Sequence, residues 1–149
     1  MLKVMKKNIL ILISFCFILT SCSLSDDTQS NPVVTKNIWH LVAVNGGIAG
    51  INEQFSTGTI IWDFDDQSLR LTVENNNTDE GIEDSFDSGV YDYSIENIGD
   101  DSYLSIDGNE IGSLNFTQSG LVINQNMMST GTGADGYVYT FLVEVVVVE

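Results

Sequence analysis

Apolar and polar residues alternate along most of the chain from residue 37 onward. Residues 59–64 place Ile60, Trp62 and Phe64 on one face, and residues 69–74 alternate in the same way after an acidic turn. These two segments predict a hairpin with one buried and one solvent-facing surface. Because the chain offers no convincing stripe with the spacing of about 3.6 residues that a helix requires, the pattern predicts an all-β domain.

Further strands are predicted by the same alternation, and they cover residues 38–44, 90–95, 103–106, 111–117, 121–125 and 137–148. Most are joined by short turns rich in Gly, Asn and Asp, which tolerate positive φ. Residues 47–58 are expected to be a loop with one helical turn near residues 53–55. About eight strands joined in this way are typical of an antiparallel up-and-down meander.

The last predicted strand, residues 137–148, bears on how the meander closes. It carries Tyr137, Tyr139, Phe141 and further valines on one face and is apolar on the other face as well. An exposed edge of that kind would be a template for aggregation, so we expect it to pair on both sides, with the first strand on one of them. About eight strands can close around a side-chain-filled or single-ligand interior. The pattern therefore favours a closed barrel, with a two-sheet β-sandwich as the alternative.

Aromatic motifs in these strands give a more specific comparison. They are Trp39, Trp62-Asp63-Phe64, Ser88-Gly89-Val90-Tyr91-Asp92-Tyr93, Tyr103-Leu104-Ser105-Ile106 and the strand from Tyr137 to Phe141. Together they resemble the lipocalin-like domains of Bacteroidetes lipoproteins, and the resemblance spans residues 37–149. It implies a lipocalin-like barrel. The chain departs from true lipocalins at Asn37, where their Gly-x-Trp opening has glycine.

Residues 1–21 read as an export signal. Three lysines precede an apolar run over residues 8–19, which is short of the roughly 20 residues of a membrane-spanning helix. The next residues, Leu19-Thr20-Ser21-Cys22, resemble the lipobox of bacterial lipoproteins. That resemblance implies cleavage before Cys22 and diacylation of its thiol, which anchors the protein to a membrane. A simple signal peptide followed by a chance cysteine is the alternative.

Residues 22–36 form the expected lipidated cysteine and flexible tether, rich in Ser and acid and containing the only proline. The Ser-Asp-Asp of residues 25–27 resembles short acidic export tags of Bacteroidetes lipoproteins, which implies an outer-membrane protein exposed at the cell surface. Cys16 lies in the segment that is removed, so Cys22 is the only cysteine left and no internal disulfide is expected.

Charge excludes one class of partner. Residues 22–149 hold 21 acidic side chains and two basic ones, for a formal charge of −19. Such a surface repels phosphate, so nucleic-acid binding is excluded. We expect a monomer whose membrane contact is the lipid anchor.

Candidate catalytic groups are sparse. The single histidine, His40, alternates with Trp39 and Leu41 and is expected to face solvent. The mature chain offers no free thiol, Ser-His motif or phosphate-binding loop. We therefore expect a protein that is not an enzyme and needs no cofactor.

Acidic residues cluster in one long irregular stretch, residues 75–87, which we call the acidic loop. Calcium takes six to eight oxygen ligands, and the candidate ligands here are Asp79, Glu80, Glu83, Asp84 and Asp87. Their spacing matches no EF-hand. A solvated loop that serves solubility is the alternative.

Inward-facing aromatic residues are the candidate ligand-binding groups, and they are Trp39, Trp62, Phe64, Tyr91, Tyr93 and Phe141. Such side chains suit a small apolar ligand, although they would equally fill a core. The sequence thus predicts a lipid-anchored lipocalin-like barrel that binds a small apolar ligand. In the alternative, the barrel is a packed scaffold whose loops bind an envelope protein or glycan.

Overall fold

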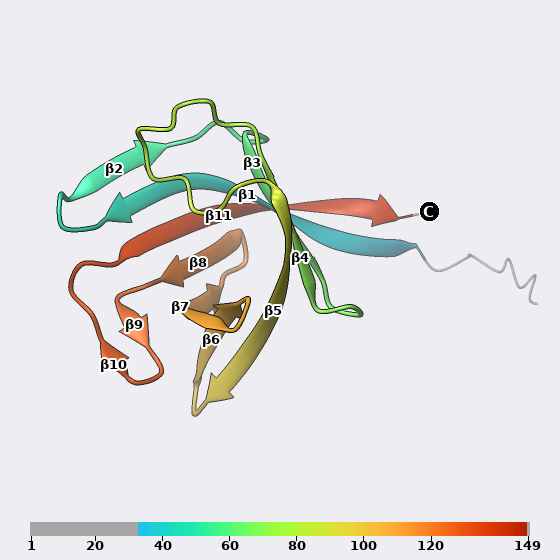
Figure 1. Cartoon of the computed structure of the whole chain (residues 1–149). Helices are drawn as coiled ribbons and strands as arrows, with labels where there is room; N and C mark the ends of the chain where they lie inside the picture. The colour runs from blue at the N-terminus through green and yellow to red at the C-terminus, as the bar shows by residue number, and fades with distance from the viewer. Residues whose placement is uncertain (1–32, 149) are drawn as a thin grey trace, which may run out of the picture. The chain divides into compact units, whose positions relative to one another are not determined.

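The computed structural model describes residues 33–148, shown in Figure 1. The predicted signal peptide, the lipidation at Cys22 and nearly all of the tether lie outside the described residues. Within residues 33–148, no helix is long and apolar enough to cross a membrane.

Residues 33–148 are built almost entirely from strands. Their bounds are β1 Val34–Gly46, β2 Ile51–Gln54, β3 Ile60–Asp65, β4 Arg70–Asn75, β5 Gly89–Ile98, β6 Asp101–Ile106, β7 Asn109–Phe116, β8 Gly120–Asn124, β9 Met127–Met128, β10 Gly131–Thr132 and β11 Tyr137–Val148. Nine of them form one antiparallel sheet in the order β11-β8-β7-β6-β5-β4-β3-β1-β2, while β9 and β10 pair only with each other. Because β11 also pairs with β1, the sheet closes. The predicted eight-stranded up-and-down barrel is confirmed, with β2 as an extra strand, and the sandwich alternative is wrong.

The extra strand β2 corrects one prediction. We expected a helical turn near residues 53–55, but Ile51–Gln54 pairs with the end of β1 from Ala43 to Gly46. β3 pairs with β1 only at Trp39 and His40. The rest of that edge would otherwise expose unpaired backbone groups, and β2 satisfies them.

A β-bulge in β1 changes which of its residues face inward. Leu41 lies opposite Phe141 while Ala43 lies opposite Thr140, so Val42 is an extra residue. Before the bulge Leu41 is fully buried, and after it Val44 is fully buried instead of Ala43. One inserted residue inverts the two-residue alternation, so that both halves of this long strand face the core.

The core fills the middle of the barrel with buried side chains from each of the eight barrel strands. Its buried members are Trp39, Leu41, Val44, Ile60, Trp62, Leu71, Val73, Tyr93, Leu104, Ile106, Leu114, Leu121, Ile123, Tyr139 and Phe141. The Trp62 ring lies 4.9 Å from that of Phe141 and 5.7 Å from that of Phe86, measured between ring centroids. These tilted and edge-on contacts are the geometry that aromatic rings favour in cores.

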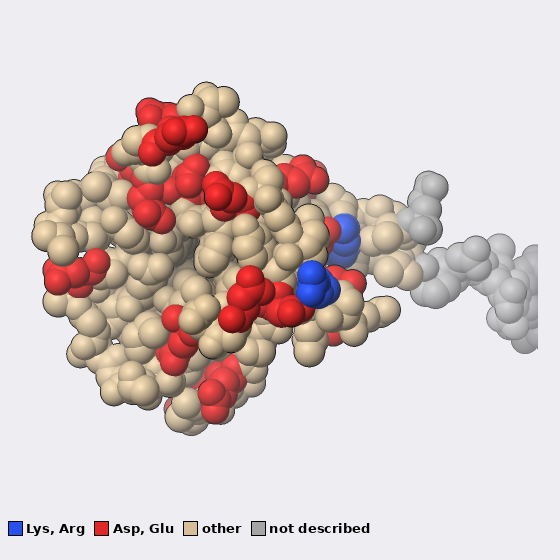
Figure 2. All heavy atoms as spheres, in the orientation of Figure 1, with Lys and Arg blue, Asp and Glu red and all other residues tan. Residues whose placement is uncertain are grey.

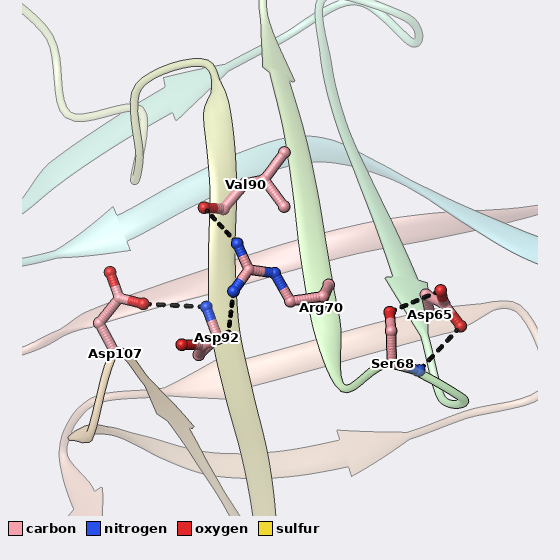
Figure 3. A network of polar contacts seen from close by, with 6 residues as sticks. All are labelled: Asp65, Ser68, Arg70, Val90, Asp92 and Asp107. Atoms are coloured by element: carbon pink, nitrogen blue, oxygen red, sulfur yellow. Dashed lines mark hydrogen bonds and ion pairs between the residues drawn. The ribbon is translucent and has the colours of Figure 1, made fainter.

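Polar side chains hold the turns and strand ends next to β4 (Figure 3). Asp65 accepts hydrogen bonds from the hydroxyl and from the backbone N–H of Ser68. The bond from the hydroxyl is the largest cause of the lowered pKa of the Asp65 carboxyl. Arg70 pairs with Asp92 across β4 and β5. Asp107 Oδ1 accepts the backbone N–H of Asp92 at 2.9 Å, which extends the sheet ladder with a side chain.

The ends of β1 and β11 leave the barrel as a two-stranded arm, which we define as residues 33–38 and 143–148 (Figure 1). β8 pairs with β11 only between Val138 and Leu142, because β8 begins at Gly120. The prediction that the last strand pairs on both sides therefore holds for its first half and is wrong for its valine-rich end. There it pairs with β1 alone, and Val145 and Val147 are 62% and 66% exposed.

Candidate functional site

A pocket of about 390 Å³ opens at the end of the barrel from which the arm leaves. We call it the mouth pocket. It is lined by Thr35, Lys36, Asn37, Trp39, Phe64, Asp66, Tyr93, Ile95, Leu114 and Phe116. These residues come from β1, β3, β5 and β7 and from the turn between β3 and β4. A pocket in the mouth of a β-barrel is a common location for a small-molecule site.

Two pairs of aromatic rings form part of the apolar wall of the mouth pocket. The Trp39 and Phe116 centroids are 5.7 Å apart, and the Phe64 and Tyr93 centroids are 4.9 Å apart in an edge-on arrangement. Trp39 on β1 and Phe116 on β7 are not on neighbouring strands, so their contact reaches across the barrel. Phe116 remains 55% exposed. Exposed aromatic surface beside a concave site can cover the apolar body of a ligand.

Polar groups are also part of the lining. The Tyr93 hydroxyl donates a hydrogen bond of 2.6 Å to Asp66 Oδ1. Burial, together with that bond and the Asp66 charge, raises the pKa of Tyr93, so the phenol keeps its proton at neutral pH. Lys36 Nζ lies 2.5 Å from Asp63 Oδ2. The mouth pocket can therefore hold an apolar body and also meet a polar end with donors and acceptors.

The acidic loop lies at the opposite end of the barrel, between β4 and β5 (Figure 1). Glu83 Oε1 accepts a hydrogen bond of 2.9 Å from the Tyr139 hydroxyl, and Phe86 packs on Trp62. Ser85, between them, has φ +83, a strained value for a residue with a side chain. The loop is thus attached to the core at the end of the barrel opposite the mouth pocket.

Four of the five candidate calcium ligands, Asp79, Glu80, Asp84 and Asp87, line one polar pocket of about 300 Å³ in the acidic loop. Asp84 Oδ2 accepts hydrogen bonds from the amides of Asn75 and Asn77, at 2.9 and 2.8 Å. Asp79 accepts the backbone N–H of Gly81, and Glu83 faces Tyr139. Across residues 33–148, no group of three or more His, Cys, Asp or Glu side chains is placed to hold a metal ion.

The six candidate aromatic residues separate into three groups. Trp39, Phe64 and Tyr93 line the mouth pocket. Trp62 and Phe141 lie in the core, and the Trp62 indole N–H has no hydrogen-bond partner within the described residues. Tyr91 lies beside the acidic loop, where its hydroxyl donates a 2.8 Å hydrogen bond to the Asp87 carbonyl.

Sequence reasoning did not assign the rest of the mouth pocket to a site. Alternation already placed Ile95 with Tyr93, and Leu114 with Phe116, on single faces of their strands. The closure of the barrel then brings those faces to one end. The polar members of the lining carry no sequence signal. Thr35 and Lys36 were expected to belong to the tether but lie in the first part of β1, and Asp66 lies in a turn.

His40 lies elsewhere and is buried. Its side chain is on the outer face of β1, between the positions of Leu142 on β11 and Ile61 on β3. It is 5% exposed, and Nε2 lies 2.9 Å from Glu144 Oε2. The prediction that His40 faces solvent is wrong: its side chain lies on the outer face, but it is flanked by the paired positions Leu142 and Ile61, contacts Glu144 and is buried.

Fold and pockets together define an eight-stranded antiparallel β-barrel with the acidic loop and its polar pocket at one end and the partly aromatic mouth pocket at the other. Comparisons with protein-family models, with curated proteins and with solved structures found no match.

Proposed function

We propose that this protein is a non-enzymatic binding protein of lipocalin-like type, whose mouth pocket takes a small apolar ligand. The observation that carries the proposal is the asymmetry of the barrel. Core side chains, Trp62 among them, fill its interior, and Phe86 of the acidic loop packs on Trp62 at one end. The other end holds the partly aromatic mouth pocket of about 390 Å³. That volume falls within the range of small-molecule sites, about 300 to 1,000 Å³.

The proposal includes a place in the cell. The lipobox-like residues 19–22, the apolar run before them and the acidic tag after them support a lipid-anchored outer-membrane protein exposed at the cell surface. Lipidation is tested by mass spectrometry of the mature protein from the native membrane. Diacylation of Cys22 adds two acyl chains to the N-terminal peptide, whereas an unmodified cysteine would contradict the anchor.

Ligand binding is tested on residues 23–149, which contain every core residue, since these lie between residues 39 and 141. N-phenyl-1-naphthylamine is a suitable neutral probe, because the acidic surface does not repel it. We expect saturable fluorescence enhancement with one probe per chain.

A pocket-filling variant makes the test specific. Leu114→Trp adds bulk beside the aromatic lining and is expected to weaken probe binding about tenfold, which corresponds to about 1.4 kcal/mol. Val90→Trp is the matched control, because Val90 is exposed and lies outside the mouth pocket. Folded wild-type protein that binds no probe would favour the packed scaffold over a ligand-binding barrel.

A further inference from the structure

The arm presents an apolar strip that continues from the mouth pocket. In the β1–β11 ladder, Asn37 lies opposite Val145 and Thr35 lies opposite Val147. Directly paired residues point to the same face of a sheet, so both valines share a face with Thr35 and Asn37, which line the mouth pocket. An exposed apolar surface that continues from a pocket is typical of an interaction surface.

The arm also differs from the rest of the domain in charge. Residues 33–38 and 143–148 contain one base, Lys36, and one acid, Glu144. Residues 39–142 contain 17 acids and one base, Arg70. Figure 2 displays the acidic side chains spread over the face of the barrel, while the arm is largely uncharged. The arm can therefore approach an apolar phase with little charge to desolvate.

The arm contains the described residue that is nearest in the sequence to the expected anchor at Cys22. The described chain begins at Val33, which is 11 residues after Cys22. Even fully extended, those residues span at most about 40 Å. A lipid on Cys22 would therefore keep the first residue of the arm within about that distance of the membrane.

We propose that the arm rests on a lipid surface, with Val145 and Val147 in contact with acyl chains, so that the mouth pocket exchanges its ligand with the bilayer. This inference rests on the proposed function for the anchor and the ligand. The apolar strip implies a ligand that carries a hydrocarbon chain and enters along the inner face of the arm. A zwitterionic surface suits the arm best, because the acidic barrel behind it is repelled by anionic headgroups.

The apolar strip of the arm could also pack against a second copy of this chain, which is the alternative to a lipid surface. The two open edges of the arm could pair with another strand. Two barrels that each carry an excess of 16 acids in residues 39–142 would, however, repel one another on approach. A zwitterionic lipid surface has no net charge and does not repel the acidic barrel. The charge distribution therefore favours a lipid surface over a second copy.

Vesicle flotation tests the inference directly. Residues 23–149 lack Cys22 and so carry no acyl chain. The protein is mixed with phosphatidylcholine vesicles at low salt, and the floated fraction is measured. We expect the wild type to float. The double variant Val145→Ser with Val147→Ser should bind at least about tenfold more weakly, since two exposed valines lose their apolar contact. Val90→Ser with Met127→Ser is the matched control, because both residues are exposed and lie away from the arm.

Several outcomes would overturn the inference. These are a wild type that does not float, a control that loses as much binding as the arm variant, and stronger binding to phosphatidylglycerol than to phosphatidylcholine vesicles at low salt. Sedimentation that reveals a concentration-dependent dimer, lost in the arm variant without any vesicle binding, would assign the arm to a second copy.

The probe titration separates this inference from the proposed function. Without vesicles, the arm variant should bind N-phenyl-1-naphthylamine as the wild type does. Vesicle binding without probe binding would keep the membrane contact of the arm and overturn the ligand site. Probe binding without vesicle binding would keep the ligand site and overturn the membrane contact of the arm.

Discussion

The hydroxyl of Tyr139 donates a hydrogen bond of 2.9 Å to the carboxylate of Glu83, which lies 56 residues earlier in the chain. Tyr139 is 4% exposed, and its hydroxyl oxygen also accepts a bond from the Gln125 amide. The bond fixes the acidic loop to the barrel wall. It ties the middle of the loop to the barrel, although none of residues 75–87 is itself fully buried.

This contact predicts a loss of stability at alkaline pH. Burial, followed by the Glu83 charge, raises the pKa of Tyr139 above its usual value of 10.0. The unfolded chain would therefore release the phenol proton first, at about pH 10, and unfolding becomes easier as the pH rises beyond that value. Urea unfolding of the wild type and of Tyr139→Phe across this range measures the effect.

Tyr139→Phe should be less stable at neutral pH, by about 1 to 3 kcal/mol, because Glu83 loses one of its two donors and keeps only the backbone N–H of Ser85. It should also lose less stability than the wild type on going above about pH 10. Tyr103→Phe on β6 is the comparison variant. An alkaline loss that is identical in the wild type and Tyr139→Phe would show that this phenol does not carry the effect.

Phe86 is predicted to be the apolar counterpart of Glu83 in fixing the acidic loop. Phe86→Ala removes a ring that packs on Trp62 and Tyr91. We expect a loss of about 2 to 4 kcal/mol in the free energy of unfolding, with a change in the Trp fluorescence of the native state. Phe116→Ala at the exposed mouth should cost much less. Equal losses in the two variants would mean that Phe86 is not part of the core.

Gly120 permits the close approach of β8 to β11. A Cβ atom there would lie 1.9 Å from the Phe141 carbonyl oxygen, which is backbone and can move only with its strand. Gly120→Ala is therefore expected to lower stability by about 2 kcal/mol or more, measured by thermal or urea unfolding. Gly133→Ala is the control, since its nearest neighbour is 3.7 Å away. A Gly120→Ala protein as stable as this control would contradict the close packing.

Calcium is predicted to have no specific effect on stability. Asp84 and Glu83 already accept hydrogen bonds from neighbouring groups, and the acidic loop offers no cluster of three ligands. The melting temperature should be the same with calcium as with magnesium at equal ionic strength, and removal of metal by EDTA should change little. A rise that only calcium produces would mean that the loop rearranges into a binding site.

Much of the architecture could be predicted because the alternation is local. Strands β3, β4 and β11 were expected nearly at their observed bounds, since apolar and polar residues change with each position. The closure of the barrel followed from the two apolar faces of the last strand. The β2 strand was missed because its residues pair only where β3 leaves the edge of β1 free.

The candidate site could be predicted only in part. Trp39, Phe64 and Tyr93 were expected to face inward, and they line the mouth pocket. Trp62 and Phe141 have the same alternation, yet they lie deeper in the core. Alternation specifies a side of the sheet, but depth along the barrel depends on the stagger between strands.

Residue type and local spacing were enough to predict the class of fold, the strongly acidic surface and the apolar character of both faces of the last strand. They could not predict that Val44 replaces Ala43 in the core, that His40 is buried, that Glu83 reaches Tyr139 or that an apolar arm leaves the barrel. Each of these depends on which strand lies beside which, and at what register. Pairing between distant segments sets both, and no short stretch of sequence encodes it.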